Sequence, residues 1–177
     1  NLGLLRGDWY DRIKVILDHS YQPEKKGFQQ TRGMLALGSG KLTGQGLFQG
    51  TQTQSSAKWS LPERQTDFIF CVCGEELGFI GGLLVIVLLL IIIIRCVMVG
   101  IRSGSNMGSL VCFGVAAFLT FQTFENIGMC IGITPVIGIT LPFFSYGGSS
   151  LFTSFAALGM VSGIHFRPKP KRNSIYY

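Results

Sequence analysis

The feature that most constrains this chain is an apolar run without a single charged residue, at positions 77–94. The stretch GGLLVIVLLLIIIIRCVMVG has the length of about 20 residues that a helix needs to cross roughly 30 Å of hydrocarbon. Two further uncharged runs cover positions 103–124 and 126–164, and Pro135 and Pro142 interrupt the second. The pattern predicts a polar first third followed by three membrane spans, which is an all-α polytopic membrane protein.

Basic residues predict the orientation of these spans. The connection after the first span and the tail after the third carry no acidic residue, and their basic residues are Arg95, Arg102, Arg167, Lys169, Lys171 and Arg172. The positive-inside rule places both segments in the cytoplasm and the polar first third outside. The net charge of +6 is then mostly a matter of topology. Nucleic-acid binding is not expected, because no stripe of Lys and Arg with interleaved aromatic residues is present.

These observations predict the following division of the chain: a large extracellular loop with short amphipathic helices (1–67), a transmembrane helix (68–96), a cytoplasmic loop (97–106), a transmembrane helix (107–131), an extracellular or re-entrant Pro/Gly segment (132–142), a transmembrane helix (143–166) and a basic cytoplasmic tail (167–177). The chain begins with Asn1 and shows no signal peptide. We therefore expect it to be the C-terminal part of a longer protein.

The polar first third predicts two short helices and a turn. WYDRIKVILDH, at 9–19, has helical spacing of its apolar residues, and FQQTRGMLALGSG predicts a second helix stopped by Gly38 and Gly40. GSGKLTGQG, at 38–46, is similar to a phosphate-binding loop. It fails that comparison because Leu42 stands where a Ser or Thr must reach magnesium. A flexible glycine-rich turn is the better interpretation.

The five cysteines, Cys71, Cys73, Cys96, Cys112 and Cys130, lie in or beside the apolar runs. None lies in the outward segment, so no disulfide framework is predicted. Small apolar packing residues are the better interpretation, because a free Cys behaves as a small hydrophobe. No cluster with metal-ligand spacing is present, and no cofactor is predicted.

The stretch LPERQTDFIFCVCGEELGF, at 61–79, places five charges against the start of the first apolar run. An ordinary water–lipid boundary accounts for Arg64, Glu75 and Glu76. Thr or Asp just before an apolar run is also typical of a helix N-cap, so the residues alone favour that role for Asp67 over a catalytic one.

The stretch ENIGMCIGITPVIGITLPFFSYGGSS, at 125–150, is not expected to form a regular helix through Pro135 and Pro142. Non-helical backbone at membrane depth is tolerated only inside protein or around a watery cavity. The segment therefore suggests an outward polar vestibule bordered by Asn126, Ser145, Tyr146, Ser149 and Ser150, with Glu125 near the boundary as a functional candidate. Close helix packing through Gly147 and Gly148 is an equally good interpretation.

These two stretches, with the glycine-rich ALGSGKLTGQGLFQGTQTQ, resemble the SEDS family of peptidoglycan polymerases, which includes RodA, FtsW and SpoVE. The resemblance covers about residues 9–166, and QTDFIF and NIGM resemble the RodA branch more than the FtsW branch. The family has about ten transmembrane helices, so the resemblance implies that this chain holds the large extracellular loop and the last three.

The resemblance implies an enzyme of the bacterial cytoplasmic membrane that polymerises lipid II on the extracellular face, in cell elongation or division, together with a class B penicillin-binding protein. The acidic residue of the family's P-E-x-x-T/N-D-F-I-F motif is Asp67 here, the implied catalytic base, and Gln65 stands where many relatives carry His. Substrate-binding candidates are Glu63, Arg64, Gln65, Lys41, Asn126, Ser145, Tyr146, Gly147, Gly148 and Ser149. A divalent cation is an alternative partner for the diphosphate. The alternative function is a lipid II translocase or a non-catalytic scaffold for the penicillin-binding protein, since broken helices also mark transporter sites.

Overall fold

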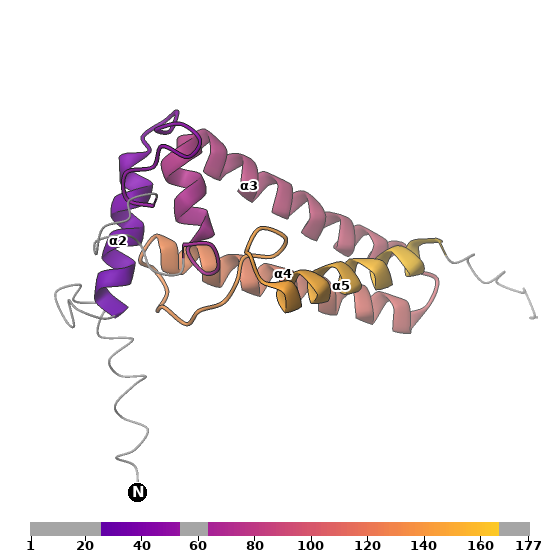
Figure 1. Cartoon of the computed structure of the whole chain (residues 1–177). Helices are drawn as coiled ribbons and strands as arrows, with labels where there is room; N and C mark the ends of the chain where they lie inside the picture. Colours follow the sequence, from indigo (N-terminus) through magenta and orange to yellow (C-terminus); the bar gives the residue numbers. More distant parts are fainter. Residues whose placement is uncertain (1–25, 54–63, 167–177) are drawn as a thin grey trace, which may run out of the picture.

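The computed structural model describes residues 26–53 and 64–166, and in these ranges the regular structure is entirely helical. Four helices follow one another: α2 (Lys26–Ser39), α3 (Ile69–Arg102), α4 (Asn106–Cys130) and α5 (Gly148–Phe166). α3 and α4 form a hairpin, α5 runs beside α4, and α2 stands across the end where α3 begins (Figure 1). The helix predicted at 9–19, the candidate Glu63 and the tail 167–177 lie outside the described residues.

Two apolar clusters hold these helices together. The first joins α2, the start of α3, the end of α4 and the α4–α5 connection, through Ala36, Phe68, Phe70, Cys71, Val85, Leu89, Met129, Cys130 and Leu141. The second joins the far half of α3 to α4 and α5, through Cys96, Cys112, Val115, Ala116, Leu119, Ala157 and Val161. All five cysteines are free, and four of them are cluster members, so they pack as small apolar residues as predicted.

The connection between α3 and α4 is shorter than the predicted loop at 97–106. The helix continues to Arg102, where the sequence predicted an end at position 96, and α4 begins at Asn106. The added turns pack closely on α4, because a Cβ on Gly100 would lie only 3.1 Å from Cys112 Cβ. α3 ends before Ser103, whose amide donates a hydrogen bond to Gly100 O.

α3 is broken at Gly78, which has φ 71° and ψ −168°. In a continuous helix the amides of Phe79 and Ile80 would bond the carbonyls of Glu75 and Glu76. Here Phe79 N and Ile80 N donate instead to Lys41 O (2.9 Å) and Leu42 O (3.3 Å). The freed carbonyls of Glu75 and Glu76 accept from Gln45 N (2.9 Å) and Gly46 N (3.0 Å).

The glycine-rich segment 40–53 therefore replaces the hydrogen bonds that α3 loses at its break. The sequence predicted this segment as a flexible turn. It does turn, but four backbone hydrogen bonds attach it to α3. Gly44, at φ 80°, permits the approach, since a Cβ there would collide with the backbone of Glu76. The loop and the break are one structural unit.

The connection between α4 and α5 covers 131–147 and is non-helical, so α5 begins at Gly148 rather than at the predicted position 143. Gly132 and Gly138 both adopt φ 83°, and Phe143 adopts φ 64°. Tyr146 N donates to Gln65 O, which draws residues 143–147 away from a helical path. The predicted interruption by Pro135 and Pro142 thus extends five residues further.

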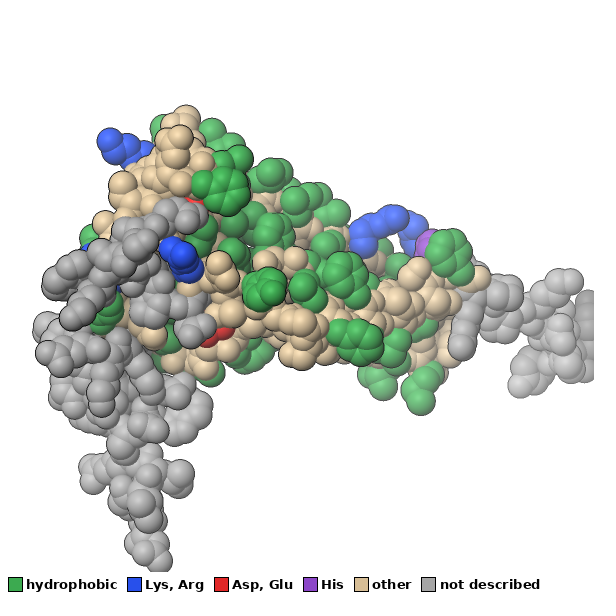
Figure 2. Space-filling model, in the orientation of Figure 1, with side chains coloured by type: hydrophobic (Ala, Val, Ile, Leu, Met, Phe, Trp, Pro, Cys, Tyr) green, Lys and Arg blue, Asp and Glu red, His purple; other side chains and the backbone are tan. Residues whose placement is uncertain are grey.

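The exterior of the hairpin is apolar. α3, α4 and α5 are each long and apolar enough to cross a membrane. On the face in Figure 2, hydrophobic side chains cover the length of these helices, and basic side chains gather toward the two ends. The chain is an all-helical polytopic membrane protein, as the sequence predicted.

Candidate functional site

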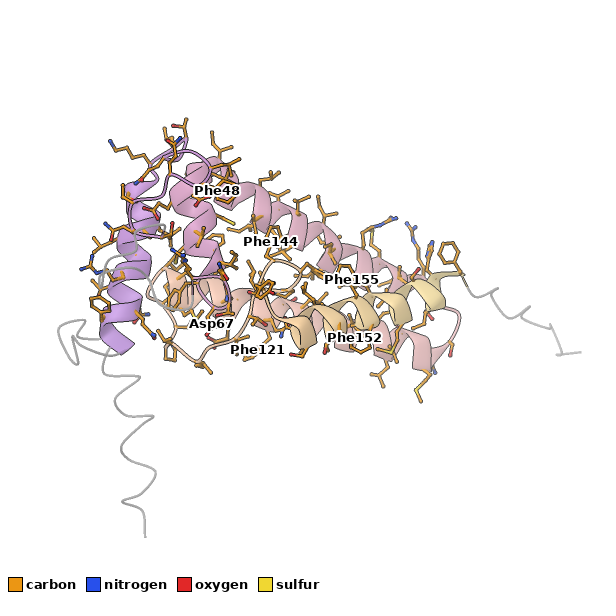
Figure 3. The ribbon with its side chains drawn as sticks, in the orientation of Figure 1. Phe48, Asp67, Phe121, Phe144, Phe152 and Phe155 are labelled. Atoms are coloured by element: carbon orange, nitrogen blue, oxygen red, sulfur yellow. The ribbon has the colours of Figure 1, made fainter. Side chains whose placement is uncertain are left out.

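The segment 64–68 leads into α3, and its backbone is held by the α4–α5 region at three consecutive carbonyls. Gln65 O accepts from Tyr146 N at 2.8 Å, and Thr66 O accepts from Ser145 Oγ at 2.6 Å. Asp67 O accepts from Asn126 Nδ2 at 2.8 Å. Three bonds in succession leave this short turn little freedom, so Asp67 occupies a fixed place between the start of α3 and the α4–α5 connection (Figure 3).

The carboxylate of Asp67 is half-buried and lies against Gly138. A Cβ on Gly138 would lie 3.1 Å from Asp67 Oδ2, and the glycine's positive φ is one that other residues rarely adopt. The next residue, Phe68, is buried in the first apolar cluster, and its packing there fixes this end of the turn. The site therefore holds the Asp67 carboxylate in place beside Gly138, a residue without a side chain.

Asn126 and Ser145 both donate hydrogen bonds to the backbone of this turn. Asn126 is fully buried, and its Nδ2 donates to both Asp67 O and Ile139 O. The hydroxyl of Ser145 is equally committed, because it accepts from Leu141 N at 2.7 Å while donating to Thr66 O. We predicted both as substrate-binding. Their donor hydrogens are used in holding the backbone around Asp67.

Arg64 and Lys41, the two predicted cationic partners, lie in different places. Arg64 is half-buried, three residues before Asp67, and its Nη1 donates to Thr53 O. Lys41 is exposed at the break of α3, where its carbonyl accepts from Phe79 N. Because α3 rises 1.5 Å per residue, that level is roughly 15 Å from Asp67. Of the two, only Arg64 belongs to the same short segment as Asp67.

The remaining predicted residues are exposed or lie at the start of α5. Gln65 is exposed, and Tyr146 keeps 77% of its surface accessible. Gly147 is half-buried, and Gly148 and Ser149 are exposed in the first turn of α5. Ser150, predicted to border the vestibule, accepts a hydrogen bond from Thr140 Oγ1 at 3.0 Å. This part of the α4–α5 connection is more accessible than the buried side chains of Asn126 and Ser145.

Glu75 and Glu76 are not the interfacial charges that the sequence suggested. Both are buried, Glu75 completely and Glu76 to 7% exposure. Glu75 accepts from the amides of Gln52 (2.7 Å) and Thr53 (2.9 Å), which belong to the glycine-rich loop. The sequence does not show whether water or a folded loop surrounds a carboxylate at the start of an apolar run. The pattern alone could therefore not distinguish these cases.

Two further residues that shape the site were not assigned to it from the sequence. Gly138 belongs to the stretch that was predicted to be non-helical but was given no role, and Thr53 was not considered. The signal for Gly138 was available, since a glycine between Pro135 and Pro142 in a non-helical stretch is where positive φ is expected. Nothing in the sequence marked Thr53. Within the two described ranges, no group of three or more His, Cys, Asp or Glu could hold a metal ion.

The fold and site together define a class of protein: a helical membrane protein in which a broken span and a non-helical connection hold one carboxylate at the end of a helical hairpin. The model of the FtsW/RodA/SpoVE family, described as cell cycle protein, matches residues 4–169, and the chain belongs to this family. The resemblance carried by the two motifs is thereby confirmed.

Individual relatives agree with this membership. The chain is 39% identical over 164 residues to "Peptidoglycan glycosyltransferase MrdB" of Escherichia coli (strain K12), covering 93% of this chain and 44% of the relative. It is 40% identical over 169 residues to "Probable peptidoglycan glycosyltransferase FtsW" of Thioalkalivibrio sp. (strain K90mix), covering 92% and 41%. The chain thus spans somewhat under half the length of these relatives.

A solved structure is similar as well. It is described as "Structural coordination of polymerization and crosslinking by a peptidoglycan synthase complex", and it aligns with a TM-score of 0.68 and 28% identity. The alignment covers 93% of this chain and 46% of that one. The similarity therefore extends over nearly all of the chain.

Proposed function

We propose that the full-length protein is a peptidoglycan glycosyltransferase that polymerises lipid II into glycan strands, with Asp67 as its catalytic base. The observation that carries the proposal is the attachment of Asp67: its own carbonyl and the two before it are each bonded to the α4–α5 region. The names of the MrdB and FtsW relatives support the reaction class.

The proposed reaction needs one base and one positive charge. A sugar hydroxyl attacks an anomeric carbon, a new C–O bond forms, and the bond to the lipid diphosphate breaks with its electron pair leaving on the diphosphate. The hydroxyl proton passes to the Asp67 carboxylate, and a positioned base contributes about 10²–10⁴-fold to such a step. We assign the diphosphate to the guanidinium of Arg64, which lies three residues before Asp67 and donates to Thr53 O.

We further propose that the Asp67 face is extracellular and that a class B penicillin-binding protein is the partner. The basic residues Arg95 and Arg102 lie at the far end of the hairpin from Asp67, which supports a cytoplasmic position for that end. The similar solved structure is described as a peptidoglycan synthase complex that coordinates polymerization and crosslinking, which supports a partner that crosslinks. QTDFIF and NIGM favour a role in elongation and cell shape.

The second candidate is a lipid II translocase or a non-catalytic scaffold, and the break in α3 is what favours it. One preparation of the full-length protein in vesicles separates the two functions, if lipid II polymerisation and lipid translocation are measured side by side. Glycan strands are the expected product. Translocation with no polymer would favour the second candidate.

A further inference from the structure

Glu75 is a buried carboxylate that the proposed chemistry does not use. It is completely inaccessible and accepts hydrogen bonds from four donors of the α2–α3 region. Oε1 accepts from Gln52 N at 2.7 Å, from Thr51 Oγ1 at 3.3 Å and from Ser39 Oγ at 3.4 Å. Oε2 accepts from Thr53 N at 2.9 Å. An ionised carboxylate has acceptors only, so this set of donors suits it.

The loop is shaped around this carboxylate. A Cβ on Gly50 would lie 2.8 Å from Glu75 Oε2, so a glycine is needed for the chain to pass so close. Burying a carboxylate is strongly unfavourable unless hydrogen bonds compensate it. The free-energy cost of burying Glu75 is therefore hard to explain by packing alone, and it points to a further role for the loop that Glu75 holds.

The loop holds Arg64 through Thr53. Thr53 is fully buried, its amide donates to Glu75 Oε2, and its carbonyl accepts from Arg64 Nη1. One residue therefore links a carboxylate inside the span to a guanidinium three residues before Asp67. Hydrogen bonds to charged groups are the stronger ones, and both links in this path are of that type.

We infer that Glu75 is a positioning residue: through Thr53 it sets where the Arg64 guanidinium lies relative to Asp67. The inference rests on the proposed function for the meaning of that position, since Arg64 would face the diphosphate of the lipid substrate. Glu75 itself touches no substrate. Its loss releases residues 51–53, and Arg64 then loses the carbonyl that orients it.

Amide hydrogen exchange on the full-length protein tests the physical link without reference to activity. Glu75→Gln keeps the size of the side chain but turns an NH₂ group toward one of the two backbone amides, so the amide of Gln52 or of Thr53 should exchange faster by about 10-fold or more. Gln45 and Gly46 are internal controls, because they donate to the backbone carbonyls of residues 75 and 76. Unchanged exchange at Gln52 and Thr53 overturns the inference.

A double-mutant cycle on lipid II polymerisation tests the functional link. Glu75→Gln and Arg64→Gln should each reduce the rate by about 10-fold, and the double variant should be no slower than the slower single one, because both changes interrupt one path. Losses that multiply would mean that Glu75 acts on stability alone, and they overturn the inference. Thr51→Val removes only the 3.3 Å hydroxyl bond and should retain nearly full activity.

Two further variants keep the outcomes distinct. Where Glu75→Gln lowers the yield of folded protein, Gly50→Ala takes its place, since its methyl group would clash with Thr53 Oγ1 and Glu75 Oε2 and so displace the residue that links Glu75 to Arg64. Full activity in Asp67→Asn would overturn the proposed function, while the exchange result at Gln52 and Thr53 would still decide whether Glu75 holds the loop.

Discussion

The carboxylate of Asp67 lies directly against Gly138, so that a methyl group on this glycine would come within 3.1 Å of Asp67 Oδ2. The two residues come from separate parts of the chain, Asp67 from just before α3 (labelled in Figure 3) and Gly138 from the connection between α4 and α5. Their contact is what makes the start of α3 and the α4–α5 connection a single site.

Gly138→Ala should reduce polymerisation while leaving the protein folded. The left-handed φ of 83° costs an alanine about 1–2 kcal/mol, and its methyl group presses on the carboxylate. The rate of lipid II consumption and the Tm measure both effects. Gly159→Ala is the matched control, because a Cβ there meets nothing within 4 Å and α5 is helical at that point. Equal activity in the two variants would contradict the contact.

Asn126→Leu should displace Asp67 and lower both Tm and activity. The variant keeps the branched shape of the side chain but leaves the carbonyls of Asp67 and Ile139 without their donor, at about 1–3 kcal/mol each. Thr120→Val, on the same helix, removes only a hydroxyl hydrogen bond to Ala116 O and should leave Tm and activity nearly unchanged. If Asn126 instead bound substrate alone, the Tm would stay at the wild-type value.

Ser145→Ala should have a smaller effect in the same direction. It removes the donor to Thr66 O and the acceptor for Leu141 N, an expected loss of about 1–3 kcal/mol in the free energy of unfolding. Thermal unfolding in detergent measures it, with Thr153→Val as the control on α5. A control variant as unstable as Ser145→Ala would argue against the tether.

Gly78→Ala should damage the fold more than it damages the chemistry. The backbone at φ 71° and ψ −168° is accessible to glycine almost alone, and strain of this kind costs about 1–3 kcal/mol. A methyl group would also collide with the loop at Leu42 and Gly44. We expect faster amide exchange at Gln45 and Gly46 and a lower Tm. Gly82→Ala, whose methyl would meet Phe70 at an ordinary 3.5 Å, should show neither.

The sequence predicted the three spans well because hydropathy and charge are local properties. The uncharged run at 77–94 lies inside α3, and the interruption at Pro135 and Pro142 falls within the non-helical connection. The ends were less accurate, since contacts distant in sequence set them. Gly100, in the part of α3 beyond its predicted end, packs against Cys112, and Tyr146, before the observed start of α5, donates to Gln65.

The site was predictable in part. Asp67 could be singled out only through the family's motif, because the residues alone favoured a helix cap. Asn126 and Ser145 were predicted to border a polar vestibule, and their use as tethers depends on which backbone groups lie opposite them. The role of Glu75 was missed for the same reason: its partners in the loop are determined by the fold at the break of α3.

The most direct test of the central claim is the initial rate of lipid II polymerisation by the full-length protein with Asp67→Asn. The substitution retains the backbone carbonyl that Asn126 holds, so the fold and membrane insertion should be unchanged. We predict a rate about 10²–10⁴-fold below wild type at equal Tm. A folded Asp67→Asn protein that polymerises at the wild-type rate would contradict the assignment of Asp67 as the base.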